Sequence, residues 1–198
     1  MTRTVGIYLF DDVEVLDFAG PLEVFSTASR VKTRLQPQTP KPFEVITISE
    51  SARAIYARGG LVVVPQFDIS NHPMIEVLII PGGIVTAELE RASLIDWIAR
   101  TADSSSITAS VCTGSFLLGK AGLLHGKSAT THWEDIPEMV SMFPEIDVQS
   151  NKRWVDTGPI VTSAGISAGI DMSLHLVARL ESEDLAIRTA RQMEYDWQ

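Results

Sequence analysis

Five short apolar runs, separated by stretches with helical spacing, most constrain what this chain of 198 residues can fold into. The runs are rich in β-branched residues, and several are apolar on both faces, as expected of parallel strands that helices cover on both sides. They lie at 4–10, 43–49, 77–80, 106–111 and 159–163. Strands that alternate with helices predict an α/β fold with an open, mostly parallel sheet and helices on both faces.

The segments between the runs complete this pattern. Helices are predicted over 86–102, 168–180 and 182–195, the last with Ser182 as its N-cap, followed by two acids. No repeat, low-complexity tract or linker divides the chain. Its length fits one domain, which we expect to span residues 1–198.

Two stretches lack a regular pattern. Residues 32–42 hold three prolines and no apolar period, which predicts a surface loop. Residues 148–162 consist of two extended runs that turn at 156–158 (Asp-Thr-Gly), which predicts a hairpin.

The charge balance excludes several classes of function. Acidic side chains outnumber basic ones by 25 to 16, for a net charge of −9. Nucleic-acid affinity comes mainly from clustered Lys and Arg, so we expect no nucleic-acid partner. No stretch approaches the roughly 18 consecutive apolar residues of a membrane span, and Asp11 and Asp12 follow too closely on the N-terminal run for a signal peptide. Cys112 is the one cysteine, which excludes an intramolecular disulfide and predicts a cytoplasmic protein.

The most informative segment is 107–119, where an apolar strand runs into Cys112 and the residues Thr-Gly-Ser open an apolar helix. A nucleophile on such a tight strand-to-helix turn, a nucleophile elbow, stands clear of the sheet. The helix N-terminus favours the thiolate and is expected to lower the pKa of the thiol. The alternative is that Cys112 is a small buried hydrophobe. The strand–Cys–Thr–Gly–helix context favours a reactive thiol.

A pair of glycines, Gly82 and Gly83, ends another predicted strand. Two glycines let the backbone approach a neighbouring site and direct an amide toward it. Together with the N–H of Thr113, such an amide could form an anion-stabilising pair. An ordinary strand-terminating turn is an equally good interpretation of the glycines alone.

Asp17 is an acid between two apolar neighbours, just past the first predicted strand. Pro21 suits the first turn of a helix, which puts Asp17 in the preceding loop. The carboxyl ends of parallel strands gather at one edge of the sheet, so we expect Asp17 to lie close to Cys112. The alternative role for Asp17 is a helix cap or a loop acceptor.

Of the four histidines, His132 follows a predicted strand and is expected near the same edge, where it could orient a reacting group. His175 lies within an apolar helix and is expected to be a satisfied core residue, whereas His72 and His125 fall in loops. No pair has the spacing of metal ligands, and neither a phosphate loop nor a dinucleotide fingerprint is present. We therefore predict no metal and no cofactor.

Taken together, these segments resemble the ThiJ/PfpI superfamily, which has the fold of class I glutamine amidotransferases and is flavodoxin-like. The resemblance covers nearly the whole chain, in VGIYLFDDVEVLDFAGPLEVF, EVLIIPGG, ITASVCTGSFLLGKAGLLHGKSATTHW and VTSAGISAGIDMSLHLV. The run SVCTGSFLLGKAGLL followed by ATTHW is specific for the branch that contains isonitrile hydratases and the N-terminal domains of AraC-type regulators. Those regulators continue into a DNA-binding module. The sequence ends at Gln198, directly after its last predicted helix, so we expect none here.

Within that branch the chain is similar to the isonitrile hydratases, and this resemblance implies roles for individual residues. The family nucleophile falls on Cys112, the neighbouring threonine on Thr113, the catalytic acid on Asp17, and the oxyanion amides on Gly83 and Thr113. The adjacent Cys-His pair of the protease-like branch is missing, because Thr113 occupies that place, which argues against peptidase activity. The resemblance also implies a homodimer.

The reaction that this resemblance implies adds water to a small electrophile, an isonitrile, through a thioimidate on Cys112 to give an N-substituted formamide. Gly82, Gly83 and His132 are then the oxyanion-binding or substrate-binding residues. A glyoxalase-type or deglycase-type cysteine enzyme is the alternative activity. A non-catalytic ligand sensor or redox sensor, related to the regulator domains, is the alternative from a different class.

Overall fold

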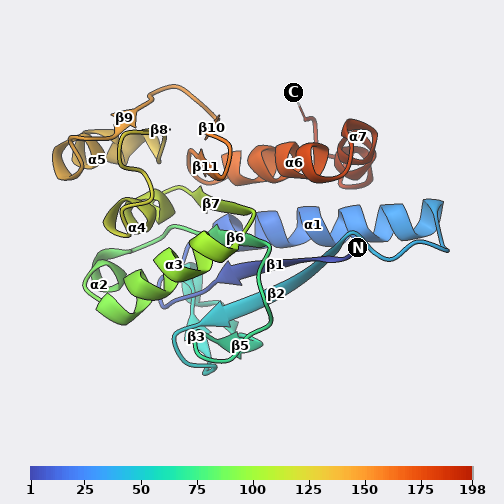
Figure 1. Cartoon of the computed structure of the whole chain (residues 1–198), viewed down its shortest axis with the longest axis horizontal. Coiled ribbons are helices and arrows are strands. Elements are labelled where there is room, and N and C mark those ends of the chain that lie inside the picture. Colours follow the sequence, from blue (N-terminus) through green and yellow to red (C-terminus); the bar gives the residue numbers. More distant parts are fainter. Residues whose placement is uncertain (198) are drawn as a thin grey trace.

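A central sheet of seven strands organises the computed structural model, which describes residues 1–197 (Figure 1). From one edge to the other, the strands are β10 (Trp154–Asp156), β11 (Ile160–Ser163), β7 (Ile107–Val111), β6 (Val77–Ile80), β1 (Arg3–Tyr8), β2 (Phe43–Ser49) and β5 (Phe67–Asp68). All neighbouring strands are parallel except β10 and β11. The central order β2-β1-β6-β7-β11 is the flavodoxin-like order 2-1-3-4-5. The predicted α/β fold is confirmed; Gln198, the last residue of the predicted domain, lies outside the described residues.

Helices cover both faces of this sheet. One group, α1 (Val15–Leu35), α6 (Ala168–Leu180) and α7 (Glu183–Gln192), packs together on one face (Figure 1). The other group, α2 (Thr86–Leu89), α3 (Ala92–Ser104) and α4 (Gly114–Lys120), packs together on the opposite face. Right-handed crossovers place α1 on one face and α2, α3 and α4 on the other, because the chain moves across the sheet in one direction after β1 and in the other after β6. Helices α6 and α7 follow the last strand and pack beside α1. Every residue of β6, β7 and β11 is buried, as the continuous apolar runs predict.

The remaining elements are short and lie outside the central sheet. They are the pair β3 (Ile55–Tyr56) and β4 (Val62–Val63), the pair β8 (Ser128–Ala129) and β9 (Asp147–Val148), α5 (Ile136–Met142), and two 3₁₀ turns, η1 (Arg58–Gly60) and η2 (Trp133–Asp135). Strands β10 and β11 form the hairpin predicted within 148–162.

Two predicted segments differ from the structure. The helix expected over 86–102 is two helices, α2 and α3, because the chain is extended at Arg91 (φ −89°, ψ 92°), whose guanidinium pairs with Glu88. The loop expected over 32–42 begins only after Leu35, because α1 continues past Lys32, which forms an ion pair with Glu181. The last helix begins after its predicted cap, Ser182, and ends at Gln192.

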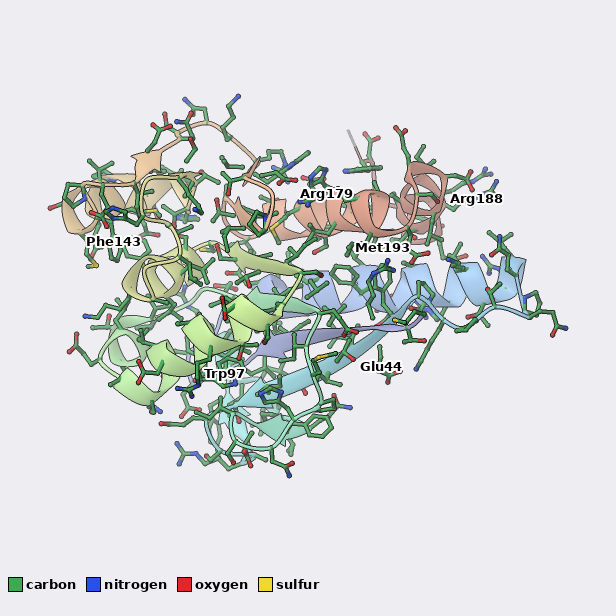
Figure 2. The ribbon with its side chains drawn as sticks, viewed as in Figure 1. Glu44, Trp97, Phe143, Arg179, Arg188 and Met193 are labelled. Atoms are coloured by element: carbon green, nitrogen blue, oxygen red, sulfur yellow. The ribbon has the colours of Figure 1, made fainter. Side chains whose placement is uncertain are left out.

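Aromatic pairs contribute to the largely aliphatic core on both faces of the sheet. Tyr8, at the end of β1, packs against Trp97 of α3, which is labelled in Figure 2, with ring centroids 5.7 Å apart. On the opposite face, Phe25 of α1 meets Phe43 of β2 edge to face at 4.9 Å. None of the helices in residues 1–197 combines the length and the apolar character needed to cross a bilayer.

Candidate active site

The structure confirms the tight strand-to-helix turn predicted at Cys112. Strand β7 ends at Val111, Cys112 has the positive φ of 55°, and α4 begins two residues later at Gly114. A positive φ is strained for a residue with a side chain, and such strain clusters at functional sites. Gly114 makes the turn possible, because a Cβ there would lie 2.1 Å from the carbonyl oxygen of Ile80. The turn therefore holds the Cys112 side chain at the carboxyl edge of the sheet.

Asp17 lies in the first turn of α1 and not in the loop where Pro21 had suggested it. Helix α1 begins at Val15, before the proline, because the chain just ahead of it is fixed to another strand end: the N–H of Glu14 donates to the carbonyl of Gly82 at 2.9 Å. The carboxyl group of Asp17 is fully buried. Its Oδ2 accepts the N–H of Gly82 at 3.0 Å, and its Oδ1 has no hydrogen-bond partner.

The predicted convergence of Asp17 and Cys112 is present. A Cβ at Gly82 would lie 2.6 Å from the Thr113 nitrogen and 3.0 Å from Asp17 Oδ2, so these three residues are packed against one another. The thiol of Cys112 lies near enough to Asp17 for each group to influence the ionisation of the other. Asp17 follows β1, Gly82 follows β6 and Cys112 follows β7, so three strand ends meet at the switch point of the sheet, where ligands bind in folds of this kind.

The electrostatics of this pair differ from the sequence prediction. Burial raises the pKa of the Cys112 thiol to about 12, the charge of Asp17 adds to the rise, and the backbone amide of Thr113 lowers it. Burial likewise raises the pKa of Asp17 to about 7, against the lowering effect of the Gly82 N–H. The expectation that the helix N-terminus keeps Cys112 ionised is therefore wrong for this pair, because desolvation outweighs the helix terminus. Near pH 7 the Cys112 thiol therefore keeps its proton, whereas Asp17 is close to the midpoint of its titration.

The predicted oxyanion donors are held in a different way than expected. The N–H of Gly83 donates to the Thr113 hydroxyl at 2.9 Å, and that hydroxyl donates to the carbonyl of Gly83 at 2.9 Å. The Gly83 amide is therefore occupied in this structure, and its use by a substrate requires that hydrogen bond to break. The Thr113 amide faces the sulfur of Cys112. The N–H of Gly82 is also occupied, because it donates to Asp17 Oδ2.

A pocket of about 210 Å³ gives access to Cys112. It is lined by Glu14, Arg58, Gly83, Cys112, Thr113, His132, Glu134, Asp135 and Ile166. Sequence reasoning missed five of these residues, which come from the turn before α1, from η1, from η2 and from the loop before α6. Their only local signal is the position of Glu134 and Asp135 next to His132. The pocket is smaller than the roughly 300–1,000 Å³ of typical drug-sized sites, so it fits a small molecule.

His132 lies in this pocket, as predicted. Its Nδ1 is 3.4 Å from Asp135 Oδ2 and 3.8 Å from Glu134 Oε2. The Cβ that an alanine at Gly165 would carry lies 2.2 Å from His132 Cδ2 and 3.1 Å from Cys112 Sγ, so the imidazole edge and the sulfur border the same glycine. Among residues 1–197, no group of three or more His, Cys, Asp or Glu side chains is arranged to hold a metal ion.

The prediction for His175 is wrong. Its side chain is 26% exposed on α6 and pairs with Asp156, whose Oδ2 lies 2.6 Å from His175 Nε2. Arg179 donates to the same Asp156 oxygen at 2.7 Å. This residue belongs to an ion-pair cluster beside the β10–β11 hairpin and not to the core.

Comparisons with known proteins show what the chain and its fold are similar to. The model of the DJ-1/PfpI family matches residues 3–179. The isonitrile hydratase of Pseudomonas putida is 33% identical, over 98% of this chain and 79% of its own length. The HTH-type transcriptional regulator GbdR of Pseudomonas aeruginosa is 26% identical over 98% of this chain, which spans only 51% of that regulator. The crystal structure of a ThiJ/PfpI family protein from Pseudomonas syringae superposes with a TM-score of 0.86 at 26% identity, covering 100% of this chain and 77% of the other.

Proposed function

Because the chain belongs to the DJ-1/PfpI family, we propose that it is a cysteine-dependent enzyme that adds water to an isonitrile and releases an N-substituted formamide. The observation that carries this proposal is the position of a buried carboxyl group, Asp17, beside the turn that holds Cys112: both Asp17 and Thr113 pack against Gly82, and the pKa of Asp17 is raised to about 7. The 33% identity to an isonitrile hydratase supports the choice of substrate class. The small size of the pocket is compatible with a small isonitrile.

The first half-reaction uses the proton that Asp17 and Cys112 exchange. Asp17 as carboxylate takes the proton of the Cys112 thiol while the sulfur forms a bond to the terminal carbon of R–N≡C. Asp17, now protonated, gives that proton to the same carbon. The product is the thioimidate Cys–S–CH=N–R, which contains all atoms of the thiol and the isonitrile. A carboxyl group with a pKa near the working pH is suited to act first as base and then as acid.

The second half-reaction hydrolyses the thioimidate. Asp17 as carboxylate takes a proton from a water molecule, whose oxygen adds to the thioimidate carbon, and the proton passes to the nitrogen. The adduct then collapses: the C–S bond breaks, the hydroxyl proton returns to the sulfur through Asp17, and R–NH–CHO leaves. The sum is one isonitrile and one water converted to one formamide. The Thr113 hydroxyl holds Gly83 in place through two hydrogen bonds, and the backbone N–H of Thr113 is directed at the sulfur of Cys112.

The test measures formamide production from alkyl and aryl isonitriles. The products are identified by chromatography, with authentic formamides as standards. The account predicts that Cys112→Ser lowers kcat/KM by roughly 10³-fold or more, as expected when a nucleophile is removed. Prior treatment with iodoacetamide is expected to abolish turnover, because Cys112 is the chain's single cysteine. Wild-type turnover by Cys112→Ser would rule out covalent catalysis.

A second candidate, a ligand sensor, is favoured by one observation, the 26% identity to the regulator GbdR over 98% of this chain. A sensor would bind a small molecule in the same pocket without converting it. Saturable binding of an isonitrile, measured by calorimetry, without any formamide would select this function over the enzyme.

A further inference from the structure

Acidic groups outnumber basic groups in the pocket around Cys112. Three carboxyl groups line the pocket, those of Glu14, Glu134 and Asp135, whereas the possible cations there are Arg58 and His132. The carboxylates are in excess by two when the imidazole is neutral and by one when it is charged. Asp17, beneath the pocket, can only add negative charge.

These charges are also unevenly placed. Arg58 Nη1 lies 3.2 Å from Glu14 Oε2, so the guanidinium neutralises the acid on its own side of the pocket. Glu134 and Asp135 lie on η2, next to His132, and no Lys or Arg pairs with either of them among residues 1–197. The side of the pocket that η2 forms is therefore acidic. The Glu134 side chain is 64% exposed and that of Asp135 is 31% exposed, so their field acts at the mouth of the pocket and is partly screened by salt.

The small size of the pocket brings any substrate close to these charged groups. In about 210 Å³, a molecule whose reactive carbon reaches Cys112 keeps any charged substituent among the lining groups. From this we infer that the pocket selects its electrophile by charge: Glu134 and Asp135 favour a substrate that carries a positive charge, such as an ammonium-bearing isonitrile, and reject anionic ones. The inference rests on the proposed function because it assigns a substrate class to the same pocket, but it can be tested without turnover.

The first experiment labels Cys112 with two methanethiosulfonates that differ in charge, one with a 2-(trimethylammonio)ethyl group and one with a 2-sulfonatoethyl group. The thiolate attacks the sulfenyl sulfur, a mixed disulfide forms and methanesulfinate leaves. Intact-mass spectrometry gives each rate constant without ambiguity, because the chain has one cysteine. Each rate constant for Cys112 is divided by the rate constant for the reaction of the same reagent with 2-mercaptoethanol. This division removes the intrinsic difference in reactivity between the two reagents.

At low ionic strength the corrected ratio of cation to anion is expected to be roughly tenfold, the size of the interaction of a few partly exposed charges at several ångströms. The ratio is expected to fall toward about twofold near 0.5 M NaCl, because salt screens exposed charges. The double variant Glu134→Gln/Asp135→Asn is expected to lose most of the preference. A ratio near or below one in the wild-type protein would overturn the inference.

A matched control separates the pocket from the net charge of −9. Asp103, at the end of α3, and Glu183, at the start of α7, are exposed and lie near the amino edge of the sheet, away from Cys112. The double variant Asp103→Asn/Glu183→Gln changes the net charge by the same amount and is expected to keep the wild-type ratio. An equal loss in both double variants would assign the preference to the whole protein and overturn the role of η2. Circular dichroism of all variants confirms that they are folded.

The second experiment compares kcat/KM for three small isonitriles: 2-(dimethylamino)ethyl isonitrile, methyl isocyanoacetate and isocyanoacetate. The expected order is cation, neutral, anion, with the cation favoured roughly tenfold over the anion. Absence of formamide from all three would refute the proposed hydratase activity, while the labelling ratio still decides the charge preference. Turnover of all three with equal kcat/KM would refute the charge preference and leave the hydratase activity intact.

Discussion

Two buried carboxyl groups at the carboxyl edge of the sheet, those of Glu88 and Asp17, differ in how completely their oxygens are hydrogen-bonded. Glu88 of α2 is 3% exposed; its Oε2 accepts the hydroxyl of Tyr8 at 2.8 Å, and its Oε1 lies 3.3 Å from Arg91 Nε. Tyr8 in turn packs against Trp97, with ring centroids 5.7 Å apart. Asp17 is 0% exposed, has one backbone donor and leaves Oδ1 without a partner. Burial raises the pKa of both carboxyl groups.

The difference in hydrogen bonding indicates that Glu88 has a structural role and that Asp17 is suited to proton transfer. A buried polar atom without a partner costs about 1–3 kcal/mol, and native structures keep few of them. Glu88 has the partners that avoid this cost. Asp17 has a free oxygen and a neighbouring thiol, which suits a group that must gain and lose a proton. Changing Asp17 should therefore affect mainly activity, whereas removing a partner of Glu88 should affect mainly stability.

The largest expected effect is on activity. Asp17→Asn should lower kcat/KM for an isonitrile by about 10²–10⁴-fold, the usual contribution of a general acid–base group. Iodoacetamide should still modify Cys112 in this variant, because the thiol remains in the pocket. Formamide assays and intact-mass spectrometry measure the two results. Unchanged kinetics would refute the catalytic role of Asp17.

The next effect is on stability, and its sign follows from the pKa of Asp17. Its folded-state pKa is raised from 3.8 to about 7, so the folded protein binds this proton more tightly than the unfolded chain does. This contribution is fully present below about pH 4 and is lost as pH rises to about 7, a loss of about 2–4 kcal/mol at 1.36 kcal/mol per pKa unit.

Asp17→Asn removes this dependence, so the variant should be more stable than the wild type at pH 8, and the two should converge near pH 4. Urea unfolding across this pH range measures the difference in the free energy of unfolding. A constant difference at every pH would contradict the burial of an ionisable Asp17.

The smallest effect concerns the structural acid. Tyr8→Phe removes the hydroxyl that donates to Glu88 and should lower the free energy of unfolding by about 1–3 kcal/mol, the cost of leaving a buried acceptor without its donor. The variant should keep kcat/KM within about twofold of the wild type, because mutations of this kind act on stability and not on the transition state. Urea unfolding and the formamide assay measure both. A large fall in kcat/KM with unchanged stability would reverse the assignment of the two acids.

Local sequence determined which parts of the site could be predicted. The elbow at Cys112, Thr113 and Gly114 is contiguous in sequence, so a strand pattern, a cysteine and a glycine were enough to predict it. The meeting of Asp17 with Cys112 followed from the rule that parallel strands end at one edge. The start of α1 was misjudged at Pro21, because the contact that fixes the chain before Asp17 comes from Gly82, which is distant in sequence.

The electrostatics and the pocket could not be predicted in this way. The pKa of Cys112 depends on how deeply the turn is buried and on the nearby charge of Asp17, and neither is encoded in the spacing of residues. The walls of the pocket come from several separate turns that meet only in the folded chain. His175 was misassigned because helical spacing does not reveal that Asp156 lies beside it.

The central claim is that the sulfur of Cys112 bonds to the isonitrile carbon before water does. Rapid acid quench of the wild-type protein with benzyl isonitrile, followed by intact-mass and peptide spectrometry, tests this most directly. The account predicts a transient increase equal to the mass of one isonitrile, located on Cys112, which decays as formamide appears and is absent in Cys112→Ser. Formamide release at the wild-type rate by Cys112→Ser, with no adduct on the wild-type protein, would contradict the account.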